Sequence, residues 1–214
     1  MANDAQYRLY GAKHSGSMIV EAAFAVAKLP VKCVDLPWDD VGWESKTLAS
    51  LNPLGQVPTL VMPDGSVMTE SAAIILHLGD RAPASGLVPA PGSPHRAAFL
   101  RWLVFLVSAV YPTFTFGDDP KRWLAGDEEA AKKLRASTDE HCKKLWRYVE
   151  GEIKGPSFLG ATWSALDLYL WEMTYWRPGR KWFATECPKL HAIGVAMGAH
   201  PACKAVVERF GPSA

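Results

Sequence analysis

The sequence predicts a protein of two parts, an α/β domain at the N-terminus followed by an all-α domain. Two observations support this prediction. Residues 1–81 alternate between short strand-like runs and apolar helical runs, whereas residues 95–214 show helical periodicity alone. Residues 82–94 contain four prolines and two glycines, a composition typical of a linker. We therefore expect domains at 1–81 and 95–214, joined by a linker at 82–94.

The first domain opens with a strand–helix–strand unit. Residues 7–11 alternate polar and apolar side chains, as a strand does, and the pattern breaks at Gly11. Residues 18–29 are Ala-rich and apolar, which predicts a helix buried on more than one side. A second strand is expected at residues 31–36.

The rest of the first domain reads as a hairpin and a helix. Residues 57–62 and 66–68 are strand candidates, and Pro63-Asp64-Gly65 between them is typical of a hairpin turn. Residues 70–80 carry apolar side chains at helical spacing.

Helices are expected throughout the second domain. Ser164 followed by Asp167 is a variant of the capping box and predicts a helix start. The other helices are expected at residues 95–116, 127–153, 188–200 and 201–210.

Charge and hydropathy argue against nucleic acid and membrane partners. Lys and Arg number 23 against 22 for Asp and Glu, so no basic field is available to attract phosphate or anionic lipid. The apolar region at 102–117 has 16 residues without a charge. A bilayer requires about 20 apolar residues, so we interpret this stretch as a buried helix.

The cysteines and the N-terminus indicate a cytoplasmic protein without a metal site. The N-terminal residues carry acid and no apolar core, unlike a secretory signal. Four scattered cysteines form no CxxC pair and no ligand spacing, so neither zinc nor a redox pair is indicated. These are Cys33, Cys142, Cys187 and Cys203.

Two motifs carry a family resemblance. The run Asn52-Pro-Leu-Gly-Gln-Val-Pro58 is followed, after the hairpin, by Thr69-Glu70-Ser71. This arrangement resembles the glutathione-binding half of the glutathione transferase family, whose bacterial and theta-like members carry both motifs at this separation. The likeness covers the whole chain in outline, with the specific motifs confined to residues 7–78. It implies a thioredoxin-like N-terminal domain and an all-helical C-terminal domain that lines a pocket for an apolar electrophile.

The resemblance also implies which residues bind glutathione. Pro58 is expected in a cis peptide bond, which leaves the N–H and C=O of Val57 to pair with the cysteinyl part of glutathione as an added strand. Glu70 and Ser71 are expected to take the γ-glutamyl end at a helix N-terminus. Gln56 is expected to contact the ligand backbone or its glycyl carboxylate.

Catalysis in this family requires a lower pKa for the glutathione thiol, which is roughly 8.5 in solution. The loop between the first strand and helix contains Ser15 and Ser17, and each is a candidate hydrogen-bond donor to the thiolate. The spacing Ser-Gly-Ser departs from the family patterns, so the choice between the two is open. Tyr10 is a third candidate, since some classes use a tyrosine, but a core position is favoured for it.

These features predict a glutathione S-transferase, an enzyme with glutathione as co-substrate and a hydrophobic electrophile as second substrate. Aromatic residues of the helix at 95–116 are candidates to face that substrate, although such a stripe is more often core: Trp102, Phe105, Tyr111, Phe114 and Phe116. The alternatives are other glutathione-dependent chemistry, as in an isomerase, etherase, dehalogenase or peroxidase, and a non-catalytic binding protein of the same fold. The resemblance further implies a homodimer.

Overall fold

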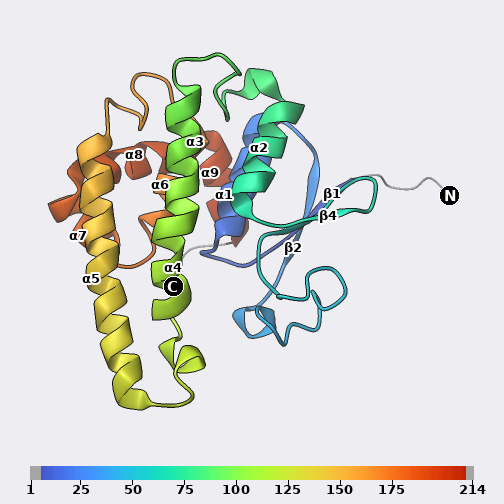
Figure 1. Ribbon diagram of the computed structural model, residues 1–214. Coiled ribbons are helices and arrows are strands. Elements are labelled where there is room, and N and C mark those ends of the chain that lie inside the picture. Colours follow the sequence, from blue (N-terminus) through green and yellow to red (C-terminus); the bar gives the residue numbers. More distant parts are fainter. Residues whose placement is uncertain (1–5, 211–214) are drawn as a thin grey trace. The chain divides into compact units, whose positions relative to one another are not determined.

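The computed structural model describes residues 6–210, which form two compact units (Figure 1). The α/β unit contains the described residues up to Ala90 together with those from Ala196 onward, and the helical unit contains Pro91–Val195. The expected α/β and all-α organisation is therefore confirmed. One detail differs from the predicted domains, because the last helix groups with the α/β unit.

The sheet of the α/β unit has four strands in the order β2-β1-β3-β4. β1 runs parallel to β2 and antiparallel to β3, and β3 runs antiparallel to β4. A parallel pair needs a crossover connection, which the helix between β1 and β2 supplies, whereas β3 and β4 are joined by the predicted turn. The strands are β1 (Tyr7–Gly11), β2 (Val31–Asp35), β3 (Thr59–Val61) and β4 (Val67–Met68).

Helices α1 (Gly16–Ala27), α2 (Ser71–Arg81) and α9 (Pro201–Phe210) complete this unit. α1 packs on β1 and against both α2 and α9. It is therefore buried on more than one side, as its apolar sequence predicts, and Phe24 within it is fully buried.

A second cluster involves the long connection between β2 and β3. Leu36 and Leu48 from that connection pack with Tyr10 and Val61 of the sheet. The same connection contains the short 3-10 helix η1 (Trp38–Asp40). Because Tyr10 is 9% exposed and belongs to this cluster, its side chain has the core position that the sequence favours.

A long continuous helix opens the helical unit. α3 (Arg96–Phe105), a π-helical segment (Leu106–Val110) and α4 (Tyr111–Gly117) follow one another without a break. This 22-residue helix has a mean hydropathy of 1.6 over its most apolar window, of which 33% is buried. It is long and apolar enough to cross a bilayer, a property that core helices of soluble proteins share. The helix extends beyond the 16-residue uncharged stretch, so the length of that stretch does not exclude a membrane span, and the absence of a membrane partner stays a prediction.

The remaining helices are α5 (Glu128–Glu152), α6 (Ala165–Met173), α7 (Arg180–Glu186) and α8 (Pro188–Gly198). The predicted capping box opens α6. Asp167 is 1% exposed, and its carboxylate accepts hydrogen bonds from the N–H of Phe158 and the N–H of Ser164, both at 2.8 Å. Its role in folding α6 follows from these contacts.

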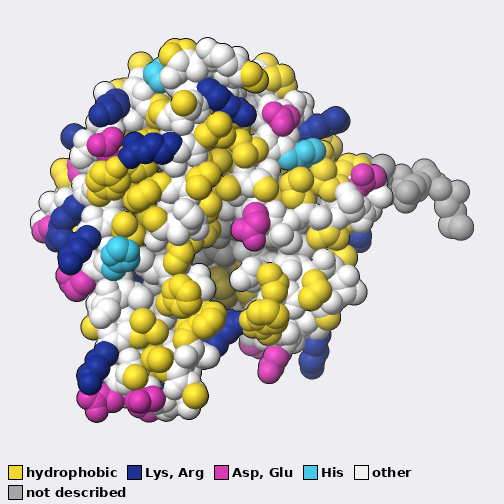
Figure 2. Space-filling model, viewed as in Figure 1, with side chains coloured by type: hydrophobic (Ala, Val, Ile, Leu, Met, Phe, Trp, Pro, Cys, Tyr) yellow, Lys and Arg dark blue, Asp and Glu magenta, His cyan; other side chains and the backbone are white. Residues whose placement is uncertain are grey.

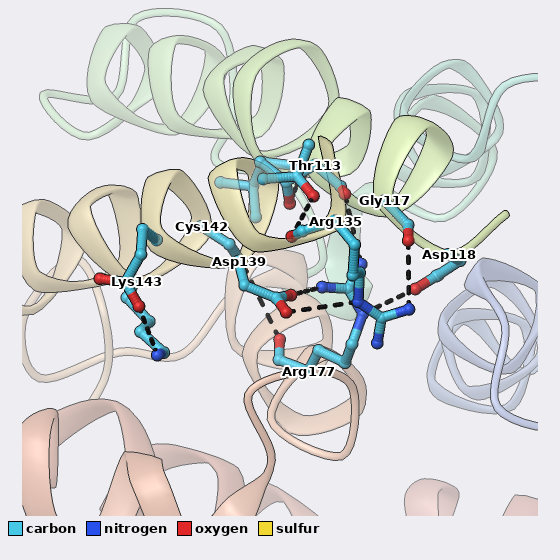
Figure 3. A network of polar contacts seen from close by, with 11 residues as sticks. Thr113, Gly117, Asp118, Arg135, Asp139, Cys142, Lys143 and Arg177 are labelled. Carbon is cyan, nitrogen blue, oxygen red and sulfur yellow. Dashed lines mark hydrogen bonds and ion pairs between the residues drawn. The ribbon is translucent and has the colours of Figure 1, made fainter. Parts of the chain in front are cut away.

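Two arginines secure the C-terminal end of α4 (Figure 3). Arg177 donates to Asp118 at 2.7 Å, to the C=O of Thr113 at 3.3 Å, and to Asp139. Arg135 donates to Asp139 at 3.3 Å and to the C=O of Gly117 at 3.1 Å. Helix geometry leaves the last carbonyls without intrahelical donors, and cations are favourable at this end. The network thus joins α4, α5 and the segment after α6.

The same network orients aromatic side chains of α4. The guanidinium of Arg177 lies 5.5 Å from the ring centre of Phe114, which packs edge-on against Trp176 at 5.2 Å. Phe114 is one of the residues proposed from the sequence to face a second substrate, and this pair holds its ring in a defined orientation.

On the face shown in Figure 2, Lys and Arg side chains are interspersed with Asp and Glu side chains. Several large apolar side chains of the α/β unit are exposed between β2 and β3: Trp38 at 58%, Trp43 at 64% and Leu54 at 42%.

Replacement of Asp167 by Ala is expected to lower the free energy of unfolding by about 2–4 kcal/mol, because two buried N–H groups lose their acceptor. Urea denaturation measures this loss. Asp127→Ala is the matched control, since Asp127 also caps a helix, by accepting from the N–H of Ala130 at 2.9 Å, but is exposed. It should cost only about 1 kcal/mol. Equal losses in the two variants would contradict the buried-acceptor explanation.

Candidate functional site

The loop between β1 and α1 is shaped by its two serines. α1 begins at Gly16, two residues earlier than the sequence predicts, with Ser15 as its N-cap. Ser15 Oγ accepts from the N–H of Ser17 at 3.2 Å, which satisfies one of the first N–H groups of the helix. Ser17 is therefore a residue of the first helical turn, and Ser15 is the residue at the tip of the helix.

The two hydroxyl groups share one set of partners. Ser15 Oγ and Ser17 Oγ lie 2.6 Å apart, and they approach the C=O of Ala12 at 2.7 and 3.1 Å. The N–H of Ala12 also donates to Ser17 Oγ at 3.1 Å. Either hydroxyl can donate to Ala12 while the other donates to its neighbouring hydroxyl. One serine proton can thus be redirected to a ligand while the other keeps the C=O of Ala12 paired.

Ser17 is the more enclosed of the two. A Cβ at Gly11 would clash with Ser17 Oγ, so this hydroxyl lies directly against the end of β1. Ser15, by contrast, occupies the cap position, where the helix dipole favours negative charge. The geometry therefore gives Ser17 the role of closing the loop and leaves Ser15 nearer to the place where an anion would bind.

The segment before β3 contains Val57, whose backbone groups have no hydrogen-bond partner within the described residues. The Val57–Pro58 peptide bond is cis, as expected from the motif. Among residues 6–210, no hydrogen bond involves the N–H or C=O of Val57. The C=O of Gln56, by contrast, accepts from Asn52 Nδ2 at 3.0 Å and from Thr59 Oγ1 at 2.7 Å, and the Gln56 side chain is exposed. Val57 is thus available for pairing with an extended ligand.

Asn52 has a role that the sequence did not reveal. Its side chain is 5% exposed and donates both to the C=O of Gln56 and to Thr59 Oγ1. It ties the two sides of the segment that contains Val57 and Pro58. The motif includes Asn52, but an asparagine before proline is common in turns, and no sequence signal distinguishes this use.

The start of α2 combines backbone strain with anion-binding geometry. Glu70 has φ 65° and ψ 107°, a conformation that residues with a Cβ rarely adopt. Its C=O accepts from the N–H of Ile74 at 3.0 Å, so the helix starts immediately after it. Its carboxylate makes no capping hydrogen bond and is exposed, whereas Ser71 is buried. Strain of this kind often marks a ligand site, because the surrounding structure must maintain it.

The sheet register brings these three segments together. In the antiparallel β1–β3 pair, Tyr10 lies opposite Thr59, so the loop that follows β1 runs beside Val57 and Pro58. In the β3–β4 pair, Leu60 lies opposite Met68, so Glu70 runs beside the same segment on its other side. Neighbouring strands are about 4.8 Å apart. The predicted residues Ser15, Ser17, Gln56, Val57, Pro58, Glu70 and Ser71 therefore all lie at one end of the sheet.

Cys33, one of the two cysteines of the α/β unit, is poorly suited to act as a nucleophile. Cys33 lies in β2, and burial together with the neighbouring carboxylate of Glu21 raises the pKa of its thiol to about 12. Only the thiolate is a good nucleophile, so Cys33 is inert near neutral pH.

Together, the three segments offer a peptide-pairing backbone with a helix N-terminus on either side of it. A helix N-terminus favours anions through its N–H groups and its dipole. Such a site suits an extended, short peptide that carries one carboxylate and one further group that ionises to an anion.

Comparison with known proteins agrees with this geometry. The pattern of the glutathione S-transferase N-terminal domain matches residues 17–81. An uncharacterized GST-like protein of Escherichia coli K12, YncG, is 37% identical over 204 residues, which cover 94% of this chain and 97% of that protein. A sphingomonad glutathione S-transferase solved in complex with glutathione is 27% identical, with a TM-score of 0.79 over 96% of this chain and 100% of that chain. A Sulfitobacter glutathione transferase homologue with bound glutathione shares the fold, with a TM-score of 0.84 at 24% identity over 96% of this chain and 99% of that chain.

Replacement of Glu70 by Gly is expected to raise the free energy of unfolding by about 1 kcal/mol, because glycine adopts a positive φ without the strain of a Cβ. Glu70→Ala removes the same carboxylate but keeps the Cβ, so it should bring no gain. Chemical denaturation of both variants without ligand measures the difference. A stability of Glu70→Gly at or below that of Glu70→Ala would refute the strain.

Cys33 is expected to resist alkylation in the folded protein. A pKa of about 12 leaves roughly one thiol in 10⁴ ionised at pH 8. Iodoacetamide labelling at pH 8, followed by peptide mass spectrometry, should modify Cys33 far more slowly than free glutathione. Labelling in urea should remove this protection, and rapid labelling of the folded chain would contradict it.

Proposed function

Because the chain belongs to the glutathione S-transferase family, we propose that it binds glutathione and transfers the glutathione thiolate to an apolar electrophile. The observation that carries this proposal is the convergence of three features at one end of the sheet: the serine loop, the unpaired backbone of Val57 and the strained start of α2. Glutathione is an extended tripeptide with a carboxylate at each end and a thiol between them, which suits this arrangement. The related sphingomonad enzyme was solved with glutathione bound.

In the proposed complex, the cysteinyl residue of glutathione pairs with the N–H and C=O of Val57 as an added strand. The γ-glutamyl carboxylate lies at the N-terminus of α2, where Ser71 and the helix dipole stabilise it, and Glu70 pairs with the γ-glutamyl ammonium. Gln56, with its exposed side chain, contacts the ligand backbone or the glycyl carboxylate. Pro58 keeps Val57 presented to the ligand.

This pose directs the thiol of glutathione toward the N-terminus of α1. Ser15 donates a hydrogen bond to the thiolate, and Ser17 then donates to the C=O of Ala12, so this carbonyl keeps a donor. The thiol proton passes to solvent. The sulfur attacks the electrophilic carbon with its lone pair, the carbon–sulfur bond forms, and the leaving group departs with its bonding electrons. A cytoplasmic homodimer and a mechanism without metal are part of the same proposal.

Titration with glutathione, combined with the ultraviolet absorbance of the thiolate as a function of pH, tests this function. The wild-type protein should lower the pKa of the bound thiol well below that of free glutathione. Ser15→Ala should raise it again by roughly 1 to 2 units, since a hydrogen bond to a charged group contributes about 1.5–3 kcal/mol. Ser17→Ala should mainly lower the stability of the protein, because Ala12 loses the acceptor for its N–H and one of the two donors to its C=O.

Ser15→Thr is the matched control, since it keeps the hydroxyl and the helix cap, and it should retain the low thiol pKa. A Ser15→Ala variant with an unchanged thiol pKa would assign the thiolate contact to another group. Wild-type protein that binds glutathione without lowering the thiol pKa would support the non-catalytic binding alternative. A bound thiolate would also serve the alternative reactions, which are isomerisation, ether cleavage, dehalogenation and peroxide reduction. A screen of electrophilic substrates separates these reactions from conjugation.

A further inference from the structure

One arginine of α9 forms hydrogen bonds with two other elements of the α/β unit. Arg209, in the last turn of α9, donates through Nε and Nη2 to both carboxylate oxygens of Glu21, at 2.6 and 2.5 Å. Its Nη1 donates to Asp35. One guanidinium therefore holds a residue of α1 and the final residue of β2 together, in the two-pronged geometry that suits arginine.

These two carboxylates belong to elements next to the serine loop. Asp35 is paired with Gly11, the last residue of β1, and the next N–H, that of Leu36, donates to the C=O of Gly11 at 2.7 Å. Glu21 lies on α1, less than two turns after the cap residue Ser15. Arg209 thus connects the strand end where the loop begins with the helix where the loop ends.

Two further contacts hold the loop at Lys13. Lys13 Nζ reaches the C=O of Phe210, the residue after Arg209, at 3.5 Å, and the exposed Trp38 donates through Nε1 to the C=O of Lys13 at 3.1 Å. Both contacts hold the main part of the loop from its solvent side. The Arg209 contacts are different in kind, because they join α1, which follows the loop, to the end of β2, which pairs with the end of β1.

Burial makes the Arg209–Glu21 ion pair stronger than a typical surface pair. The side chains of Glu21 and Arg209 are 13% and 32% exposed, so the pair is shielded from solvent to a considerable extent. Exposed pairs contribute little because water and salt screen them. Removal of Arg209 would leave the Glu21 carboxylate enclosed beside Cys33 and without its counter-charge, and α1 would move to expose it to water.

We propose that Arg209 is a positioning residue for the thiolate site: it sets the position of α1 and its cap Ser15 relative to the strand edge at which Val57 binds the ligand. This inference rests on the proposed function. The hydrogen bond from Ser15 to sulfur weakens steeply as its length and angle depart from the optimum. A small shift of α1 away from β1 therefore weakens thiolate stabilisation while the pairing at Val57 and the α2 end of the site persist.

The test compares Arg209→Met with Arg147→Met in the full-length protein. Arg147 is a matched control, because it also donates through Nε and Nη2 to a glutamate, Glu186, but lies in the helical unit and is more exposed. Arg209→Met should raise the pKa of the bound glutathione thiol by roughly 0.5 to 1 unit, with at most a small change in glutathione affinity. Arg147→Met should leave both unchanged.

A second readout needs no ligand. The N–H of Met18 donates to the C=O of Ser15 at 3.0 Å and reports on the first turn of α1. Its hydrogen exchange should accelerate roughly tenfold in Arg209→Met, relative to the amide of the core residue Leu9, and stay unchanged in Arg147→Met. Normalisation to Leu9 separates a local change from a loss of global stability.

The linkage to Glu21 provides the final check. If Arg209 acts through Glu21, the effects of Glu21→Gln and Arg209→Met on the thiol pKa are not additive, and Arg209→Lys, which cannot form the fork, recovers only part of the shift. Wild-type protein that lowers the thiol pKa, together with an Arg209→Met variant that does so equally, would overturn the positioning role and leave the proposed function standing. If the wild-type protein does not lower the pKa of the bound thiol, the proposed function is overturned instead. In that case the hydrogen exchange of the Met18 amide tests the positioning role separately, and an unchanged rate in Arg209→Met overturns it.

Discussion

The antiparallel pairing of β1 with β3 is the constraint on which the site depends. Its register is fixed by burial: Leu9 and Leu60 lie opposite each other and are both buried, whereas Tyr10 and Val61 on the other face join the cluster with Leu36 and Leu48. A slip of one residue would exchange these faces. Because the register cannot slip, the segment with Val57 is held beside the serine loop, and β4 brings the start of α2 to its other side.

The proposed site therefore consists of backbone features more than of reactive side chains. Val57 contributes its peptide groups, α2 contributes a helix N-terminus, and α1 contributes another together with the hydroxyl of Ser15. The side chains around them mainly shape the main chain: Ser17 closes its loop onto Ala12, and Asn52 fixes the turn before Pro58.

Much of the fold could be predicted from sequence because the relevant signals are local. The hairpin turn at Asp64, the capping box at Ser164 and Asp167, and the thioredoxin-like element order are all confirmed.

Other features could not be predicted. The sequence pattern places the start of α1 two residues too late, because Gly16 and Ser17 are weak helix formers and the hydroxyl of Ser15 overrides this preference by capping the helix. The strain at Glu70 carries no sequence signal, since a positive φ is normally expected at Gly, Asn or Asp. The ion pair of Arg209 with Glu21 links residues too far apart in the chain for any local pattern to indicate it.

The grouping of α9 with the α/β unit has a consequence for biosynthesis. The whole helical unit is inserted in chain order between α2 and α9, so a ribosome must complete it before the last piece of the α/β unit is made. Domains generally fold one after another as they emerge, with the N-terminal one first. In this protein the N-terminal unit cannot complete its packing as soon as it emerges, and the surface of nascent α1 that α9 later covers stays exposed until α9 has been made.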